Sequence, residues 1–317
     1  MARRSDCFIG TILCLNILVS VAIVGVNKYV YTHYGFPNLT LTMIHFVVTF
    51  LGLLICRLFG IFRPKNLPVL RMLPLSLTFC GFVALTNLSL QFNTVGTYQV
   101  LKTLTTPCIM TINAVAYGKP SSWRLRLTFL PVVVGVALNS HYDLKFSPIG
   151  MAFAAAGVLV TSLYQIWVGT FQSNLQCDSA QLLFYQAPLS ALLLLPPIAY
   201  FEPPSSVSLT LSSQAVGMVG LSAGIAFLVN LSIYWIIGNT SALTYNMAGH
   251  LKFCSALTLG YLIFNDPISL EQVMAILLVC LGVFAYSWVK LREDIVAKAA
   301  TQLPTTALGQ QSVKSAA

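Results

Sequence analysis

The stretch that decides the fold reads Asn230-Leu231-Ser232-Ile233, then Thr244-Tyr245, then Lys252, then Phe264-Asn265-Asp266-Pro267. An earlier stretch has the same order of features: Asn87-Leu88-Ser89-Leu90, Thr97-Tyr98, Lys102, and Tyr117-Gly118-Lys119-Pro120. Each copy carries one lysine inside an apolar run as long as a helix. A charged side chain at mid-membrane costs about 2.5–3.5 kcal/mol. Because the chain accepts this cost twice, at matching places, we interpret the two lysines as one anion-binding centre.

The overall composition is that of an integral membrane protein. Of the 317 residues, 57% are hydrophobic and only 8% are charged, and the mean hydropathy is +0.81. A soluble domain carries about 25% charged residues. The net charge of +9 follows membrane topology, as described below, so no nucleic-acid partner is expected. The eight cysteines form neither a CxxC pair nor a Cys/His ligand spacing, which indicates buried apolar side chains and predicts no metal or cofactor.

Ten apolar runs are long enough to cross a bilayer, which takes about 20 residues each. They cover 7–31, 40–62, 70–91, 95–117, 122–140, 147–171, 179–201, 211–237, 241–263 and 268–290. Turn-forming residues separate them. The sequence therefore predicts an all-α integral membrane fold with ten transmembrane helices. Residues 291–317 are polar, and we expect a disordered cytosolic tail.

The basic residues predict the orientation of these helices, because cytosolic loops carry an excess of lysine and arginine. With the N-terminus in the cytosol, Lys145 is the one basic loop residue on the far side, and Lys28, Lys102 and Lys252 lie within the membrane. The other basic residues are then cytosolic: Arg3, Arg4, Arg57, Arg63, Lys65, Arg71, Lys119, Arg124, Arg126, Lys290, Arg292, Lys298 and Lys314. An even number of helices places both termini in the cytosol.

The repeat predicts two domains of opposite orientation. Residues 1–145 form a first five-helix repeat and residues 146–290 a second one. Five is odd, so the second copy enters the membrane from the other side. Lys119 then ends its helix in the cytosol, whereas Asp266 ends the matching helix on the far side, as the charge rule requires. Inverted repeats of this kind underlie alternating access, with the substrate site at the repeat interface.

The predicted substrate site uses polar residues on the faces that the lysines share. Tyr98 is four residues before Lys102 and Tyr245 seven before Lys252, so each tyrosine lies on its lysine's face. The predicted substrate-binding residues are Lys102, Lys252, Tyr98, Tyr245, Thr97, Thr244, Asn87, Asn230 and Lys28.

Several of these residues have a structural alternative. Asn87 and Asn230 serve equally well in helix–helix hydrogen bonds, which are common in membrane bundles. Lys28 either lines the far-side gate or reaches the lipid headgroups. His45 and His250 either relay protons or are satisfied polar groups in the bundle.

The acidic residues exclude some function classes by their positions. All of them lie in loops, termini or helix ends, so no carboxylate is expected at mid-membrane, where cation-coupled carriers usually bury one. A cavity with lysines and no carboxylate is positive and selects anions. Lysine ammonium groups and tyrosine hydroxyls suit a phosphate. The sequence contains no catalytic set, so we expect no enzyme.

The residues quoted above resemble a known family. Asn27-Lys28, Thr97-Tyr98 with Lys102, and Thr244-Tyr245-Asn246 with Lys252 are similar to the triose-phosphate/nucleotide-sugar transporter family of the drug/metabolite transporter superfamily. Gly35-Phe36-Pro37-Asn38 and the run from Ser232 to Thr240 resemble most closely the E branch of solute carrier family 35. The resemblance covers residues of about 10 to 290. It implies antiport, a Golgi or endoplasmic reticulum membrane, and substrate phosphate on Lys102 and Lys252.

One position departs from the pattern of the plastid members, which have Lys-Arg where this chain has Lys252-Phe253. The missing guanidinium removes a bidentate phosphate contact, so a nucleotide sugar, held also by its base, is favoured over a small sugar phosphate. We therefore predict a secondary antiporter that exchanges a nucleotide sugar for a nucleotide monophosphate. A triose- or sugar-phosphate exchanger and a non-transporting scaffold or receptor of the same fold remain alternatives. The lipid bilayer and a small anionic phosphate are the expected partners, and a homodimer is left open.

Overall fold

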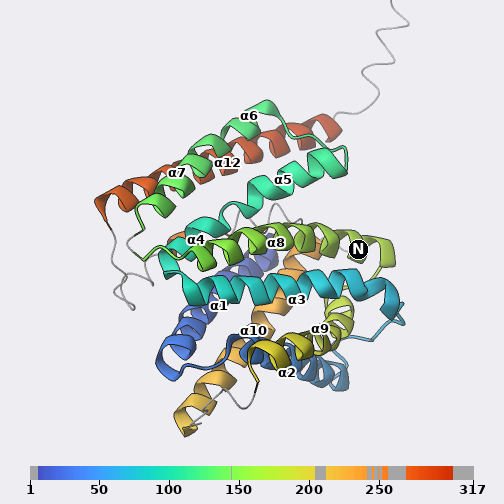
Figure 1. The fold of residues 1–317 in the computed structure, drawn as a ribbon. Coiled ribbons are helices and arrows are strands. Elements are labelled where there is room, and N and C mark those ends of the chain that lie inside the picture. The colour runs from blue at the N-terminus through green and yellow to red at the C-terminus, as the bar shows by residue number, and fades with distance from the viewer. Residues whose placement is uncertain are drawn as a thin grey trace, which may run out of the picture.

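The computed structural model describes residues 6–143, 145–203, 212–240, 245, 249, 252–255 and 269–302. Within these ranges every regular element is a helix (Figure 1). The helices are α1 (Asp6–Tyr34), α2 (Asn38–Leu58), α3 (Val69–Phe92), α4 (Val95–Lys102), α5 (Thr105–Ala116), α6 (Trp123–Leu127), α7 (Phe129–His141), α8 (Pro148–Leu175), α9 (Ser179–Phe201), α10 (Ser213–Asn239) and α12 (Leu270–Gln302).

In the described part of the chain, seven helices are long and apolar enough to cross a membrane. They are α1, α2, α3, α8, α9, α10 and the first part of α12, up to Glu293. The protein is therefore an all-helical, multi-pass membrane protein. The predicted span 241–263 lies mostly outside the described residues, so the count of ten spans and the two inverted repeats stay predictions.

Two predicted spans are each divided into two helices. The span predicted at 95–117 consists of α4 and α5, and the one at 122–140 consists of α6 and α7. Proline explains both breaks, because its ring excludes the carbonyl four residues earlier and its nitrogen carries no proton. Pro107 acts on the carbonyl of Thr103, and Pro131 on that of Leu127. After the first break, the Thr103 and Leu104 amides bond three residues back, to Val100 and Leu101, both at 3.1 Å.

The predicted start of the disordered tail at residue 291 is wrong for the first part of that segment. Helix α12 continues through this boundary to Gln302. The residues after Lys290 include strong helix formers such as Leu291 and several alanines, and they extend a helix already nucleated in the membrane. Polarity alone therefore does not end this helix. Residues 303–317 lie outside the described part.

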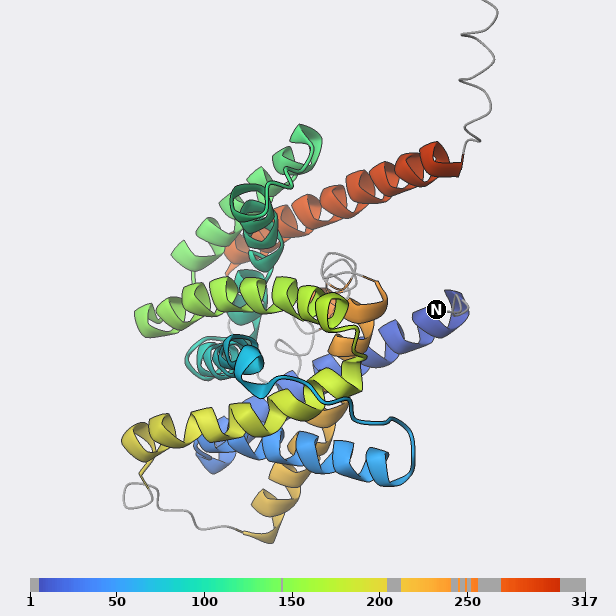
Figure 2. The ribbon, with the colours of Figure 1, turned by 90° about the vertical axis from the view of Figure 1, so that its right-hand side faces the viewer.

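The helices pack in pairs that join distant parts of the chain. α3 lies along α8, α7 along α12, α1 against α10, and α2 against α9 (Figures 1 and 2). The α7–α12 pair approaches closely at glycines. A Cβ at Gly135 would lie 2.6 Å from Val279 Cγ2, and a Cβ at Gly282 would lie 2.9 Å from the Thr128 carbonyl oxygen. Small residues at such contacts are typical of membrane helices.

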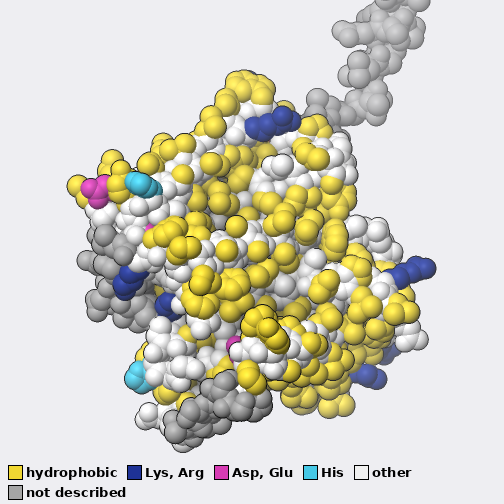
Figure 3. Space-filling view, viewed as in Figure 1, with side chains coloured by type: hydrophobic (Ala, Val, Ile, Leu, Met, Phe, Trp, Pro, Cys, Tyr) yellow, Lys and Arg dark blue, Asp and Glu magenta, His cyan; other side chains and the backbone are white. Residues whose placement is uncertain are grey.

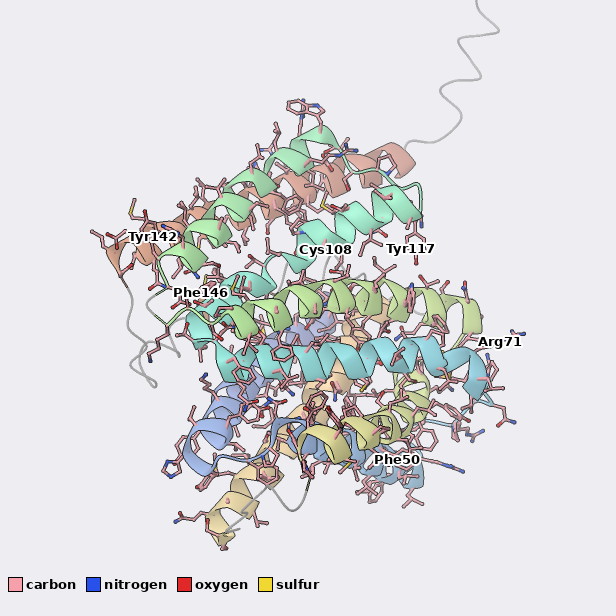
Figure 4. The ribbon with its side chains drawn as sticks, in the orientation of Figure 1. Phe50, Arg71, Cys108, Tyr117, Tyr142 and Phe146 are labelled. Carbon is pink, nitrogen blue, oxygen red and sulfur yellow. The ribbon has the colours of Figure 1, made fainter. Side chains whose placement is uncertain are left out.

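The two ends of the bundle differ in charge. Arg71 and Tyr117 lie at one end, which the charge rule assigns to the cytosol and which we call the basic end, and Tyr142 and Phe146 lie at the opposite end (Figure 4). Between the ends, the face seen in Figure 3 is mainly hydrophobic, with Lys and Arg near its margins. This distribution fits a bilayer around the middle of the bundle.

Candidate substrate-binding cavity

A cavity of about 110 Å³ lies between the helices and brings the two lysines together. Lys102 and Lys252 both line it, with the tyrosines Tyr98 and Tyr245. The other residues that line it are Ser20, Ile23, Val24, Asn27, His45, Phe82, Val83, Thr86, Asn87, Leu90, Ala226, Val229, Asn230 and Ile233. Because four amide or imidazole side chains contribute to its wall, we call it the amide cavity.

A second cavity, of about 80 Å³, adjoins the first at the lysines. Lys102, Lys252, Tyr245 and Phe82 line both. The remaining residues of the second cavity are Gln99, Thr103, Thr105, Thr106, Thr161, Gln165, Gly249 and Phe253. Four of them are threonines, so we call it the hydroxyl cavity. The lysine and tyrosine side chains thus form a positive boundary between two neutral, polar chambers.

A wider hollow opens at the basic end. It encloses about 800 Å³ between α5, α8 and the last turn of α10, and its wall includes Tyr117, Lys119 and Asp178. Gln165 lines both this vestibule and the hydroxyl cavity. The vestibule therefore leads from the basic end toward the lysines.

Each lysine has one hydrogen-bonding partner among the described residues. Lys102 Nζ donates to the Tyr98 hydroxyl at 3.0 Å and lies 5.1 Å from the centroid of that ring. Lys252 Nζ lies 4.3 Å from the centroid of Tyr245 and donates to Asn16 Oδ1. A lysine ammonium has three N–H donors. The contacts with described residues take one donor from each lysine, and within this part of the chain two donors of each have no partner.

The end of α4 favours a positive charge at Lys102. Lys102 is the last residue of α4, and the carboxyl end of a helix carries a partial negative charge. The start of α4 is fixed as well, because Thr94 Oγ1 accepts from the Thr97 amide at 3.1 Å. The break that Pro107 causes therefore places a helix terminus inside the membrane, and the lysine sits at this terminus.

The asparagines combine the two roles that the sequence left open. Asn87 Nδ2 donates to Thr42 Oγ1 at 3.0 Å, and Asn230 Nδ2 donates to Thr49 Oγ1 at 3.3 Å. Both bonds join helices, and both asparagines also line the amide cavity. Thr42 Oγ1 donates its own proton to the Asn38 carbonyl at 2.9 Å, so it can only accept from Asn87. The Asn87 carbonyl oxygen is thus left as an acceptor beside the cavity.

Two predicted site residues do not line either lysine cavity. Thr97 is 2% exposed and donates to Asp143 Oδ2 at 2.6 Å. Lys28 donates to the carbonyl oxygens of Leu90 and Asn93 at 2.9 and 2.7 Å. Their surroundings explain both positions, since Thr97 faces α7 and Lys28 binds carbonyls at the carboxyl end of α3. The predicted Thr244 and His250 lie outside the described residues.

Sequence reasoning missed Asn16 and Ser20 on α1, and it quoted Asn27 only as part of the family resemblance. Asn16 contacts Lys252, and Asn27 accepts from Ser222 Oγ at 2.5 Å. His45 Nε2 bonds to the same Ser222 oxygen at 2.8 Å, so the described structure places this histidine in a helix-joining contact. Asn16, Ser20 and Asn27 follow a spacing of four and seven, which puts them on one face of a helix. This spacing was the signal available in the sequence.

Polar contacts join helices at the opposite end of the bundle. Glu202 accepts from the amides of Leu39 and Thr40 at the start of α2, both at 2.8 Å. Lys28 ties α1 to the end of α3 through the carbonyl contacts described above. The structure therefore has a vestibule at the basic end and polar ties between helices at the other.

The electrostatics of the cavities favour an anion. Among the described residues, those that line the amide and hydroxyl cavities include two lysines and no carboxylate. The described part of the chain also contains no group of three or more His, Cys, Asp or Glu residues that could hold a metal ion. A positive, carboxylate-free cavity raises the local concentration of negatively charged ligands.

Comparison with known proteins gives consistent matches over nearly the whole chain. The model of the Triose-phosphate Transporter family matches residues 8–287. UDP-xylose transporter 1 of Arabidopsis thaliana is 33% identical over 281 residues, which are 87% of this chain and 82% of the relative. UDP-rhamnose/UDP-galactose transporter 2 of the same plant is 32% identical over 86% of this chain and 81% of its own length.

Two more distant matches also cover most of the chain. GDP-mannose transporter GONST5 of Arabidopsis thaliana is 27% identical, with 86% of this chain and 82% of the relative covered. One solved crystal structure superposes with a TM-score of 0.62 at 17% identity, over 88% of this chain and 96% of the other. At this identity the superposition supports the fold alone. The family and the named relatives are transporters and not enzymes.

Proposed function

Since the chain belongs to the Triose-phosphate Transporter family, we propose that it carries a nucleotide sugar across the membrane in exchange for a nucleotide monophosphate. The relatives named for UDP-xylose, UDP-rhamnose, UDP-galactose and GDP-mannose support the substrate class. They differ in both sugar and base, so the class is proposed and the individual substrate is left to experiment.

The observation that carries this proposal is the pair of lysines between two chambers. Among the described residues, Lys102 and Lys252 each have one hydrogen-bond partner for three N–H donors, and no carboxylate in the cavity wall competes for the others. A charge-assisted hydrogen bond to phosphate is about twice as strong as a neutral one. The diphosphate of a nucleotide sugar would bind at this boundary. Its base and its sugar would then extend into the amide and hydroxyl cavities.

The packing of the helices supports the proposed inverted repeats. Numbering the predicted spans from one to ten, α1, α3, α8 and α10 are spans one, three, six and eight. In a repeat of five spans, span three corresponds to span eight and span one to span six. The contact between α3 and α8 therefore corresponds to the contact between α10 and α1, and both contacts occur. In the same way, the contact between α2 and α10 corresponds to the contact between α9 and α3, and both occur as well. Such equivalence is expected if the halves rock against each other to alternate access.

The proposed orientation places both termini and the vestibule in the cytosol. In this arrangement the vestibule would receive substrate from the cytosol. We propose the Golgi or endoplasmic reticulum membrane as the location, because the nucleotide-sugar relatives suggest delivery from the cytosol into a compartment that uses these sugars.

The test is exchange by the purified chain in liposomes. Vesicles preloaded with UMP or GMP are supplied outside with radiolabelled UDP-xylose, UDP-galactose, UDP-rhamnose or GDP-mannose. We expect uptake of at least one of them, dependent on the preloaded nucleotide. A Lys65→Gln variant serves as a matched control, because Lys65 is exposed and donates to the Leu175 carbonyl outside both cavities. Failure to exchange any nucleotide sugar, with intact protein, would contradict the proposal.

A further inference from the structure

Asn16 is a buried amide that touches the substrate-binding lysine from another part of the chain. It lies in the first half of α1 and is 1% exposed. Its Oδ1 accepts from Lys252 Nζ, which lies 236 positions later in the sequence. Its Nδ2 donates to Ser232 Oγ on α10 at 2.7 Å. The amide is therefore fixed on one side by α10 and presents its oxygen to the lysine.

The orientation of this amide follows from its partners. An ammonium group can only donate hydrogen bonds, so the Asn16 atom that faces Lys252 must be the carbonyl oxygen. Ser232 Oγ in turn donates to the Val229 carbonyl at 3.0 Å, which leaves the serine oxygen to accept from Asn16 Nδ2. The chain of donors runs from lysine to amide to serine to backbone, and each bond in it has a defined direction.

An amide differs from a carboxylate at this position in one important respect. A carboxylate would hold the ammonium more strongly, but it would also neutralise the charge that attracts the substrate. The amide oxygen orients the ammonium and leaves its full charge available to a phosphate. Lys102 obtains the same result from the uncharged Tyr98 hydroxyl.

We propose that Asn16 is a positioning residue, which holds the Lys252 ammonium toward the phosphate of the substrate without neutralising it. The proposal rests on the proposed function for the identity of the ligand, but the effect of Asn16 on the charged form of Lys252 can be measured without any ligand. Asn16 itself is outside the set of residues that line the two lysine cavities, so it acts through Lys252.

The first experiment measures binding of the nucleotide sugar that is exchanged best, in a double-mutant cycle. Asn16→Ala in the otherwise unchanged chain should weaken binding by about threefold to tenfold, which is part of the value of a hydrogen bond to a charged group. In a Lys252→Gln background the same change should have almost no further effect, because the group that Asn16 positions is gone. Equal losses in both backgrounds would mean that Asn16 only packs α1 against α10.

The second experiment needs no substrate and reads the amine directly. Reductive methylation of Lys252 in the purified chain is followed by mass spectrometry, since only the neutral amine reacts. Asn16→Ala removes an acceptor that stabilises the charged form, so methylation should be faster than in the unchanged chain. Asn16→Asp supplies a carboxylate, which stabilises the charged form further, so methylation should be slower.

Two controls separate positioning from packing. Ser232→Ala removes the anchor of the amide and should shift methylation in the direction of Asn16→Ala, by less. Phe8→Leu disturbs another contact between α1 and α10, the ring pair with Trp235 at 5.5 Å, and should leave methylation unchanged. If the three Asn16 forms react equally fast, the proposal is wrong. If their order is as expected but no nucleotide sugar binds, Asn16 keeps its role and the proposed function fails.

Discussion

At the scale of single residues, the partners of the two lysines in the described part of the chain are all neutral. Lys102 has the Tyr98 hydroxyl and Lys252 has the Asn16 amide and the face of Tyr245. A buried ion pair would reduce the desolvation cost but would also remove the attraction for anions. The described partners thus leave the desolvation cost of the two lysines largely uncompensated, and a bound anion would compensate it.

Replacing either lysine tests whether it binds the anion at a cost in stability. Lys102→Gln and Lys252→Gln should each weaken nucleotide-sugar binding by about tenfold to a hundredfold, because a charge-assisted hydrogen bond contributes about 1.5–3 kcal/mol. Thermal stability without ligand should be kept or raised, because an intramembrane charge is removed. Melting curves with and without nucleotide sugars measure both quantities.

The same curves distinguish a transporter from a scaffold. In a scaffold, the lysines would satisfy internal polar groups, so both variants would melt earlier and no form would respond to ligand. If the ligand stabilised wild type and both variants equally, the two lysines would not form the binding site. Lys65→Gln again controls for loss of a lysine as such.

The sequence predicted the tyrosine–lysine pairs better than the rest of the site. A spacing of four residues places Tyr98 beside Lys102 whatever the tertiary structure. Asn16 is the contrary case, because its contact with Lys252 depends on how α1 lies against the second half of the chain. Thr97 was predicted from its place beside Tyr98, yet adjacent residues on a helix point about 100° apart, and Thr97 faces Asp143 instead.

At the scale of elements, the start of α2 depends on a residue far away in sequence. The Glu202 carboxylate accepts from two amides and from the Thr40 hydroxyl, where α2 has unpaired N–H groups. The residue that precedes α2, Pro37, provides no side-chain cap for these N–H groups. Glu202 therefore links the end of α9 to the start of α2 at the end of the bundle opposite the vestibule.

Glu202→Gln should loosen this end. The amide keeps one acceptor but loses the charge that interacts with the helix terminus, an effect of about 0.3–2 kcal/mol. We expect a cysteine introduced at Val24, in the amide cavity, to react faster with an impermeant thiol reagent added at that end. Asp178→Asn is the matched control, because Asp178 caps α9 at the basic end. An equal rate in wild type and Glu202→Gln would show that this contact does not close the cavity.

The α7–α12 pair offers a prediction on stability. A Cβ at Gly135 would lie 2.6 Å from Val279 Cγ2 and 2.8 Å from the Ala275 carbonyl oxygen. Gly135→Ala must therefore separate the helices, and overpacking of this kind costs about 1–3 kcal/mol. The melting temperature should fall clearly.

Gly217→Ala is the control for Gly135→Ala. Gly217 is also within a membrane helix, but nothing lies within 4 Å of a Cβ placed there. Alanine is the better helix former by about 0.8–1.0 kcal/mol, so this variant should be as stable as wild type or slightly more stable. Equal melting temperatures for the two variants would contradict the close packing of α7 and α12.

The boundaries of the elements were predicted less well than their existence. Hydropathy identifies an apolar run, but it does not separate α4 from α5 or α6 from α7, because each break spans only one or two residues within a long apolar run. Pro107 and Pro131 carried this information. The end of α12 was missed for the opposite reason, since a polar segment can remain helical when it extends an apolar helix.

At the scale of the whole molecule, the proposed topology makes one further prediction. Epitope tags at the N-terminus and at the C-terminus should both be accessible from the cytosol in cells whose plasma membrane alone is permeabilised. An even number of spans and the excess of lysine and arginine at the basic end require this result. A C-terminal tag that is protected until the organelle is opened would mean an odd number of spans.

The two inverted halves remain a prediction from the order of motifs, whereas no motif predicts which end of the bundle holds the vestibule. A sequence repeat is the same in every state of a transporter. Which end is open depends on contacts between helices, and two conformations of one protein differ by only a few kcal/mol. One sequence encodes both conformations, so it does not predict which of them a structure will show.

If the proposed site holds two lysines and, as in the described part of its wall, no carboxylate, its charge determines which movements of the carrier respond to voltage. With a substrate of charge −2 bound, the site is neutral overall, and its passage moves no net charge. The empty site carries two positive charges, and each charge that crosses the full membrane potential involves about 2.3 kcal/mol per 100 mV. Return of the empty carrier would also leave both ammonium groups unneutralised in a medium of low polarity. We therefore expect the rate of exchange between two bound substrates to be independent of membrane potential. We also expect the empty carrier to return slowly, so that one nucleotide must be exported before the next substrate is imported.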